Sequence, residues 1–247
     1  MIGDLSIPIE QRKQWVWDQI KLFHPEVVRE NFPEDDPFML SEIVVRNCYR
    51  YRASPGQLVM DIGANIGVFT ALCALGGSRV VAYEPNTPAR EVLKETLKRN
   101  CIEGLVTVSD RAVWVRSGTC GYHGLASPPS GKDQTWTSYN GAVNTPGVDL
   151  VETPCISLAE AVGDEQWDCV KMDIEGAEFE ILLQASDETL SHINYLTLEL
   201  HNGWADKRLY TALFERLVRS FVVGGVSDGD PRFAGENRLI SAYCERK

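Results

Sequence analysis

The segment Asp61-Ile62-Gly63-Ala64-Asn65-Ile66-Gly67 joins a short apolar run to a stretch with helical character. The apolar run, residues 57–62, is typical of a buried parallel strand, and Phe69 to Gly76 is expected to form the helix that follows. Glycines at such a turn let the backbone bend sharply and approach a ligand closely. The segment therefore predicts a ligand-binding strand–turn–helix unit of an α/β fold.

The glycine spacing and the acid before it indicate the kind of ligand. Dinucleotide-binding turns normally read G-x-G-x-x-G and place a pyrophosphate at the helix N-terminus. This turn reads G-x-x-x-G and is preceded by Asp61. A carboxylate there would repel a pyrophosphate, and it could instead accept a hydrogen bond from the ammonium of an amino-acid group. The turn thus favours an aminoacyl nucleoside over NAD.

A second acid follows the next predicted strand, Arg79 to Tyr83, in the segment Glu84-Pro85-Asn86. Glu84 lies about 20 residues after the turn, which is the spacing expected for an acid that accepts hydrogen bonds from both ribose hydroxyls. The strand, turn, helix, second strand and acid together favour a nucleoside site over an α/β protein with an unused glycine turn.

The rest of the chain continues the alternation of strands and helices. Such alternation predicts a mostly parallel sheet with helices on both faces. Residues 1–55 are expected to form a helical cap, and residues 56–247 an α/β domain with a long irregular insertion at about 118–150. The insertion could contain a short hairpin, and its length is typical of functional lids. Further strands are expected at 106–109, 112–115, 167–172, 194–200, 221–226 and 239–244, and helices at 9–23, 37–51, 87–100, 157–161, 177–184 and 206–219.

Composition narrows the class of protein. The 247 residues suffice for one α/β core, and a net charge of −11 disfavours a phosphate backbone as substrate. The seven cysteines form no C-x-x-C pair, so neither a disulfide framework nor a zinc site is expected, and a reducing compartment such as the cytoplasm fits. No secretory signal and no apolar run of about 18 residues is seen, so no membrane span is expected.

Five segments resemble the motifs of the FkbM-type methyltransferases in consistent order over roughly residues 56–202. The most specific is Val170-Lys171-Met172-Asp173-Ile174-Glu175-Gly176-Ala177-Glu178; the others are 59–70, 81–86, 110–114 and 198–201. The resemblance implies a Rossmann-like methyltransferase fold whose seven-stranded sheet has an antiparallel last strand. It also implies S-adenosylmethionine as cofactor and, usually, methylation of a hydroxyl oxygen. A small-molecule, natural-product or carrier-bound substrate is expected, and the oligomeric state is left open.

The cofactor is expected beyond the carboxyl ends of the strands, where ligands bind in open α/β sheets. The turn would hold the methionine part and the sugar, the acid after the second strand would hold the ribose, and the third motif would lie near the adenine by analogy with the family. The expected cofactor-binding residues are Asp61, Gly63, Ala64, Asn65, Gly67, Glu84, Pro85, Asp110, Arg111, Ala112 and Asp173.

The expected catalytic residues are Asp173, Glu199 and His201, after the fourth strand and at the end of the fifth. A methyl donor with a sulfonium is already electrophilic, so the protein must position the acceptor and remove its proton. An imidazole titrates near neutral pH, which makes His201 the better base and leaves Asp173 to orient the acceptor or the base. Alternatively, His201 is structural, and Asp173 and Glu175 cap the following helix.

Other chemistry stays open at this point. Asp173, Glu199 and Asn202 could hold Mg²⁺, although the resemblance points away from metal dependence and no metal is expected. An N-, sugar or nucleic-acid methyltransferase would share the fold. An NAD-binding oxidoreductase requires the missing G-x-G-x-x-G, and a binding protein with a degenerate site would show a broken motif. Four aromatic residues could roof the acceptor or merely pack: Trp15, Trp17, Trp136 and Tyr139.

Overall fold

The structure is a computed structural model of the chain. It describes residues 9–23, 29–32, 43, 48–124, 137–138, 149–201, 207–228 and 240–247. Among these residues, none of the helices combines the length and the apolar character that crossing a membrane requires.

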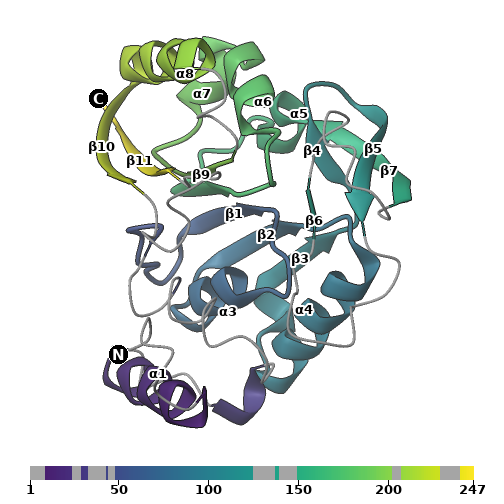
Figure 1. The fold of residues 1–247 in the computed structure, drawn as a ribbon, viewed down its shortest axis with the longest axis vertical. Helices are drawn as coiled ribbons and strands as arrows, with labels where there is room; N and C mark the ends of the chain where they lie inside the picture. Colours follow the sequence, from purple (N-terminus) through teal and green to yellow (C-terminus); the bar gives the residue numbers. More distant parts are fainter. Residues whose placement is uncertain are drawn as a thin grey trace.

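A seven-stranded sheet forms the centre of the molecule (Figure 1), with strand order β10-β11-β9-β8-β1-β2-β3. Five neighbouring strands run parallel: β9, β8, β1, β2 and β3. The strand β11 pairs antiparallel with both β9 and β10. The expected Rossmann-like sheet with an antiparallel last strand is therefore confirmed. The strands are β1 (Leu58–Ile62), β2 (Arg79–Tyr83), β3 (Val106–Ser109), β8 (Cys169–Met172), β9 (Tyr195–Leu200), β10 (Phe221–Asp228) and β11 (Ile240–Arg246).

Helices cover both faces of this sheet (Figure 1). Consecutive residues of a strand point to opposite faces, and both are apolar where both faces are covered. Met60 accordingly packs in one buried cluster with α6 and α8, and Val59 in another with α1, α3 and α4. The helices are α1 (Ile9–Phe23), α3 (Val68–Leu75), α4 (Thr87–Arg99), α5 (Leu158–Val162), α6 (Glu178–Gln184), α7 (Asp187–Ser191) and α8 (Lys207–Ser220).

A second, four-stranded sheet contains the two ends of the insertion expected at about 118–150, while residues 125–136 and 139–148 lie outside the described residues. Its order is β4 (Ala112–Trp114), β7 (Asp149–Ser157), β5 (Gly118–Gly124) and β6 (Thr137–Ser138). The insertion thus begins in β5 and ends in β7, which pair antiparallel from Gly118 opposite Cys155 to Gly124 opposite Asp149. The bounds of these strands could not be predicted from the sequence, because their glycines and polar residues lack the apolar alternation that marks a strand, whereas a ladder needs only backbone groups.

In the N-terminal part, α1 agrees with the helix expected at 9–23. Most of the helix expected at 37–51 lies outside the described residues; within it Ile43 is helical, and Cys48 and Tyr49 form a turn followed by residues without regular secondary structure. Trp15 and Trp17 pack against the buried cluster around α3. Trp136 and Tyr139, the other two residues of the expected aromatic roof, lie outside the described residues.

Candidate active site

The turn after β1 takes a conformation that requires glycine. Gly63 and Gly67 have φ angles of 80° and 86°, and Asn65 between them has a φ of 50°. A Cβ at Gly63 would overlap the backbone carbonyl oxygen of Asp173, and one at Gly67 would lie 2.7 Å from the side chain of Leu93. The turn therefore lies directly against the end of β8, which brings the two most informative sequence motifs together.

Glu84 ties the end of β2 to this turn. Its Oε2 accepts a hydrogen bond of 2.7 Å from the backbone N–H of Asn65, and its Oε1 accepts one of 2.8 Å from that of Asn86. Burial raises the pKa of Glu84 to about 7, because the two backbone hydrogen bonds and Lys171 offset only part of its effect. Since a carboxylate has about four acceptor sites, two remain for further donors.

Asp61 is fully buried beneath the turn and is already paired. Its Oδ2 accepts a hydrogen bond of 2.6 Å from the hydroxyl of Thr70, and its Oδ1 lies 3.2 Å from Nζ of Lys171. Lys171 also donates to the carbonyl oxygen of Gly63 at 2.7 Å. The ammonium that contacts Asp61 in this structure is therefore the side chain of Lys171.

The third motif lies at the same edge of the sheet. Asp110 and Arg111 follow β3 and are exposed, and the buried Ala112 begins β4. The backbone N–H of Glu84 donates to the carbonyl oxygen of Ser109, so β2 and β3 end side by side (Figure 1). The residues that are expected to lie near the ribose and the adenine are thus found at neighbouring strand ends.

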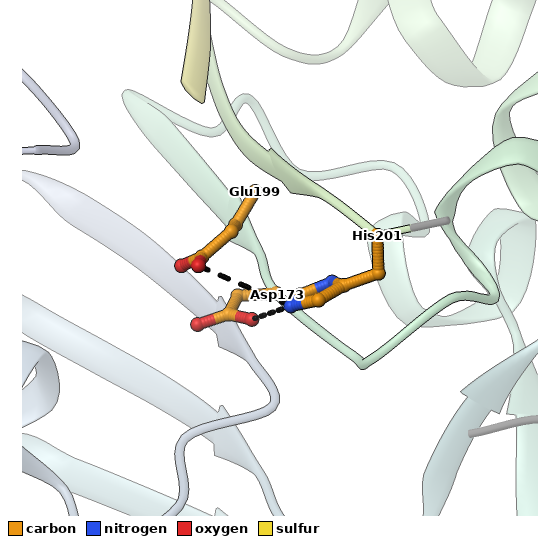
Figure 2. A group of neighbouring side chains, drawn as sticks. All are labelled: Asp173, Glu199 and His201. Atoms are coloured by element: carbon orange, nitrogen blue, oxygen red, sulfur yellow. Dashed lines mark ion pairs between the residues drawn. The ribbon is translucent and has the colours of Figure 1, made fainter. Parts of the chain in front are cut away.

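The three expected catalytic side chains converge in space (Figure 2). Nε2 of His201 lies 3.8 Å from Oδ1 of Asp173, 3.9 Å from Oε1 of Glu199 and 3.4 Å from Oε2 of Glu175. Asp173 follows β8 and Glu199 lies in β9, so adjacent parallel strands deliver them to one edge. The sheet therefore explains why residues distant in sequence form one cluster.

Glu178 fixes the ring of His201, a role that sequence reasoning missed. Its fully buried Oε1 lies 2.9 Å from Nδ1 of His201 and also accepts hydrogen bonds from the backbone N–H groups of Ile174 and Gly176. Nδ1 therefore carries a proton and Nε2 faces the other carboxylates. The only signal was the position of Glu178 at the end of the Asp173–Glu178 motif.

The carboxylates around His201 change its acid–base behaviour. Burial lowers the pKa of His201, but Glu178, Glu175 and Asp173 raise it well above the ordinary value. For Asp173 the directions are reversed: burial raises its pKa, whereas Lys171 and His201 bring it below its ordinary value. The sequence predicted an imidazole that titrates near neutral pH, whereas in the structure the surrounding carboxylates raise the pKa of His201 and favour its protonated form.

Tyr49 is a further member of the cluster that sequence reasoning missed. Its hydroxyl donates to Oδ2 of Asp173 at 2.7 Å and lies 3.4 Å from Oε2 of Glu199. It precedes the first motif and has no spacing relation to Asp173, so only the tertiary structure reveals it.

The cluster also has the composition of a cation site. Within the described part of the chain, Asp173, Glu199 and His201 each offer one atom, and these atoms lie within 4.8 Å of one another. The magnesium set considered from sequence had Asn202 in place of His201, and Asn202 is outside the described residues. A cation already borders the cluster, because Nζ of Lys171 lies 3.5 Å from Oδ2 of Asp173.

Comparisons with known proteins agree with this geometry. A family model described as the methyltransferase FkbM domain matches residues 61–221. The 31-O-demethyl-FK506 methyltransferase FkbM of Streptomyces tacrolimicus is 27% identical over 228 residues, an alignment that covers 80% of this chain and 85% of that protein. The AMB antimetabolite synthetase AmbE of Pseudomonas aeruginosa is 27% identical over 180 residues, which cover 60% of this chain and 8% of the synthetase.

A solved structure shares the fold at low sequence identity. A protein named as an rRNA-methylase from Clostridium thermocellum superimposes with a TM-score of 0.51 at 12% identity, covering 82% of this chain and 97% of that one. At this identity the likeness concerns the fold alone.

Proposed function

Because the chain belongs to the FkbM methyltransferase family, we propose that it transfers a methyl group from S-adenosylmethionine to a hydroxyl oxygen. The observation that carries the proposal is the convergence of His201, Asp173 and Glu199 beside the glycine turn. The name of the Streptomyces relative, a 31-O-demethyl-FK506 methyltransferase, supports oxygen as the acceptor atom. It also supports a natural product, free or carrier-bound, as the class of substrate.

The residues at the turn fit the proposed cofactor. Glu84 retains two acceptor sites for the two ribose hydroxyls, and Oδ1 of Asn65 is buried without a hydrogen-bond partner among the described residues. Gly63, Ala64 and Gly67 would border the methionine part, with Asp61 behind them and Asp173 beside them. Pro85, Asp110, Arg111 and Ala112 would border the ribose and the adenine.

In the proposed reaction the cofactor supplies an electrophilic methyl group on a sulfonium. The acceptor oxygen forms a C–O bond to the methyl carbon as the C–S bond breaks, and the hydroxyl proton leaves. Nε2 of His201 is the proposed proton acceptor, since Glu178 fixes its direction. His201 must first lose the proton that its neighbours stabilise, so the enzyme should work best at alkaline pH. Asp173 and Glu199 would hold the acceptor hydroxyl.

The main alternative is methylation of a nitrogen, a sugar or a nucleic acid on the same fold. The net charge of −11 weighs against a nucleic acid. Incubation with S-adenosylmethionine carrying a labelled methyl group and a cell extract would distinguish these acceptors. Label in alkali-stable methyl groups of small molecules, free or released from a carrier, supports the proposal. Label in RNA, on the side chains of proteins or on nitrogen contradicts it.

The proposed cofactor leads to a first prediction, on binding. Titration calorimetry should show S-adenosylhomocysteine binding with a Kd on the order of micromolar, and no binding of NADH. Gly63→Ala should remove binding, because its methyl group overlaps the backbone of Asp173. Gly104→Ala is the matched control, since no atom lies within 4 Å of a Cβ at that position. Absence of S-adenosylhomocysteine binding to the unmodified chain would refute the proposed cofactor.

A second prediction concerns the pH dependence of cofactor affinity. Only a charged Glu84 can accept from two ribose hydroxyls, and its pKa is about 7. Affinity for S-adenosylhomocysteine should therefore be level above pH 7 and fall up to about tenfold per unit below it. The folding stability of the ligand-free chain should change with pH in the opposite direction. Because folding raises the pKa of Glu84, the stability that this group contributes is present below its ordinary pKa and is lost as pH rises through about 7.

Glu84→Gln provides the control for this pH dependence. The amide cannot titrate, so the affinity of this variant for S-adenosylhomocysteine should be weaker but much less sensitive to pH. An unmodified chain whose affinity is constant between about pH 6 and 8 would show that Glu84 does not bind the ribose as a carboxylate.

A further inference from the structure

We infer that Tyr49, which precedes the residues matched by the family model, is a positioning residue of the active site. Its hydroxyl holds one oxygen of Asp173 and one of Glu199, so that the other oxygen of each faces Nε2 of His201. The inference rests on the proposed function, and it assigns part of the active site to the N-terminal segment.

The inference rests on the two oxygens of each carboxylate, because one of them contacts Tyr49 and the other faces His201. The hydroxyl of Tyr49 contacts Oδ2 of Asp173 at 2.7 Å and Oε2 of Glu199 at 3.4 Å. The opposite oxygens, Oδ1 and Oε1, are the ones that lie 3.8 and 3.9 Å from Nε2 of His201. One hydroxyl thus lies behind both carboxylates, and their other oxygens face His201 (Figure 2).

Tyr49 itself is firmly held. It is 3% exposed, and its ring packs edge-on against Phe69 with a centroid distance of 5.3 Å. Nζ of Lys171 lies 5.3 Å from the centre of the ring, and the hydroxyl of Tyr195 donates to the carbonyl oxygen of Arg50, the next residue. Burial, Asp173 and Glu199 raise the pKa of Tyr49 well above its ordinary value, so its hydroxyl keeps its proton and remains a donor.

Removal of the hydroxyl should disturb His201 through the two carboxylates. Four carboxylates face this imidazole: Asp173, Glu175, Glu178 and Glu199; the nearby cation is Lys171, which contacts Asp173. Without Tyr49, Asp173 and Glu199 lose a donor and can turn toward the imidazolium. Closer carboxylates hold the proton of His201 more tightly and occupy the space meant for the acceptor.

The test compares Tyr49→Phe with Tyr51→Phe. Both keep the ring and remove one hydroxyl, but that of Tyr51 donates to Gln57 at 2.8 Å, in the same segment and away from the carboxylates. In ¹⁵N NMR spectra of the imidazoles, Tyr49→Phe should raise the titration midpoint of His201 by about half a pH unit or more, and Tyr51→Phe should leave it unchanged. His201→Gln identifies the signal among the four histidines. Equal midpoints in all three chains would overturn the inference.

Turnover gives a second, independent readout. With labelled S-adenosylmethionine and the acceptor fraction of the extract, Tyr49→Phe should lower kcat about tenfold or more and change the Kd of S-adenosylhomocysteine less than about twofold. An unchanged kcat, or a loss confined to cofactor affinity, would contradict a positioning role. If the unmodified chain does not bind S-adenosylhomocysteine, the proposed function fails, while the NMR comparison still decides whether Tyr49 orients the carboxylates.

Discussion

Replacement of His201 by alanine is expected to slow methyl transfer at least about a hundredfold while leaving S-adenosylhomocysteine affinity nearly intact. The imidazole is the side chain whose Nε2 faces Asp173 and Glu199, whereas the proposed cofactor contacts come mainly from the turn and from Glu84. Loss of the base therefore affects the transfer step rather than binding. The measurement is the rate of label transfer to the extract-derived acceptor, combined with calorimetry.

His192→Ala is the matched control for this experiment. His192 follows α7 and precedes β9, at the opposite end of that strand from Glu199 and His201, and its Nδ1 lies 3.1 Å from the carbonyl oxygen of Glu165. This variant should retain the full rate. A His201→Ala protein that transfers label normally would exclude His201 as the base, and one that no longer binds S-adenosylhomocysteine would make His201 structural or cofactor-facing.

Lys171→Met is expected to lower the free energy of unfolding by about 3–5 kcal/mol. Lys171 is 3% exposed and Asp61 is fully buried, so removal of the ammonium leaves a carboxylate without its cation in the interior. The penalty is that of an uncompensated buried charge, which exceeds the net contribution of the intact pair. Urea denaturation followed by circular dichroism measures the effect.

Two further variants isolate the charge as the cause. Asp61→Asn combined with Lys171→Met removes both charges and should recover a large part of the lost stability. Lys94→Met breaks an exposed pair with Glu91, at 2.9 Å, and should cost less than about 1 kcal/mol. If Lys171→Met alone unfolds at nearly the same urea concentration as the unmodified chain, Asp61 does not depend on this lysine.

The sequence predicted the parts of the site that follow strand ends. Asp61, Glu84 and Asp173 could be placed together because parallel strands present their carboxyl ends at one edge of the sheet. His201 joined them for the same reason, since β9 pairs with β8. Local motifs and the sheet topology therefore suffice to predict most of the candidate site.

The sequence could not reveal the contacts that orient the site. Tyr49 reaches Asp173 across 124 positions, and no spacing rule connects them. The raised pKa of His201 depends on the joint positions of Glu175, Glu178 and Asp173, which a pattern of residue types does not give. For a similar reason the bounds of β5 within the insertion could not be predicted from the sequence, because its pairing with β7 is fixed by backbone hydrogen bonds rather than by side-chain pattern.

The position of β11 has a consequence for the order in which the active site can be made. β11 is synthesised after the other six strands of the main sheet, yet it lies between β9 and β10, with Ser241 opposite Glu199. While the chain is still on the ribosome and residues 240–246 are in the exit tunnel, β9 has no neighbour on that side. Every expected catalytic side chain has then been made, but the strand that carries Glu199 is still an open edge. The edge of the site that carries Glu199 is therefore completed only after β11 has left the exit tunnel.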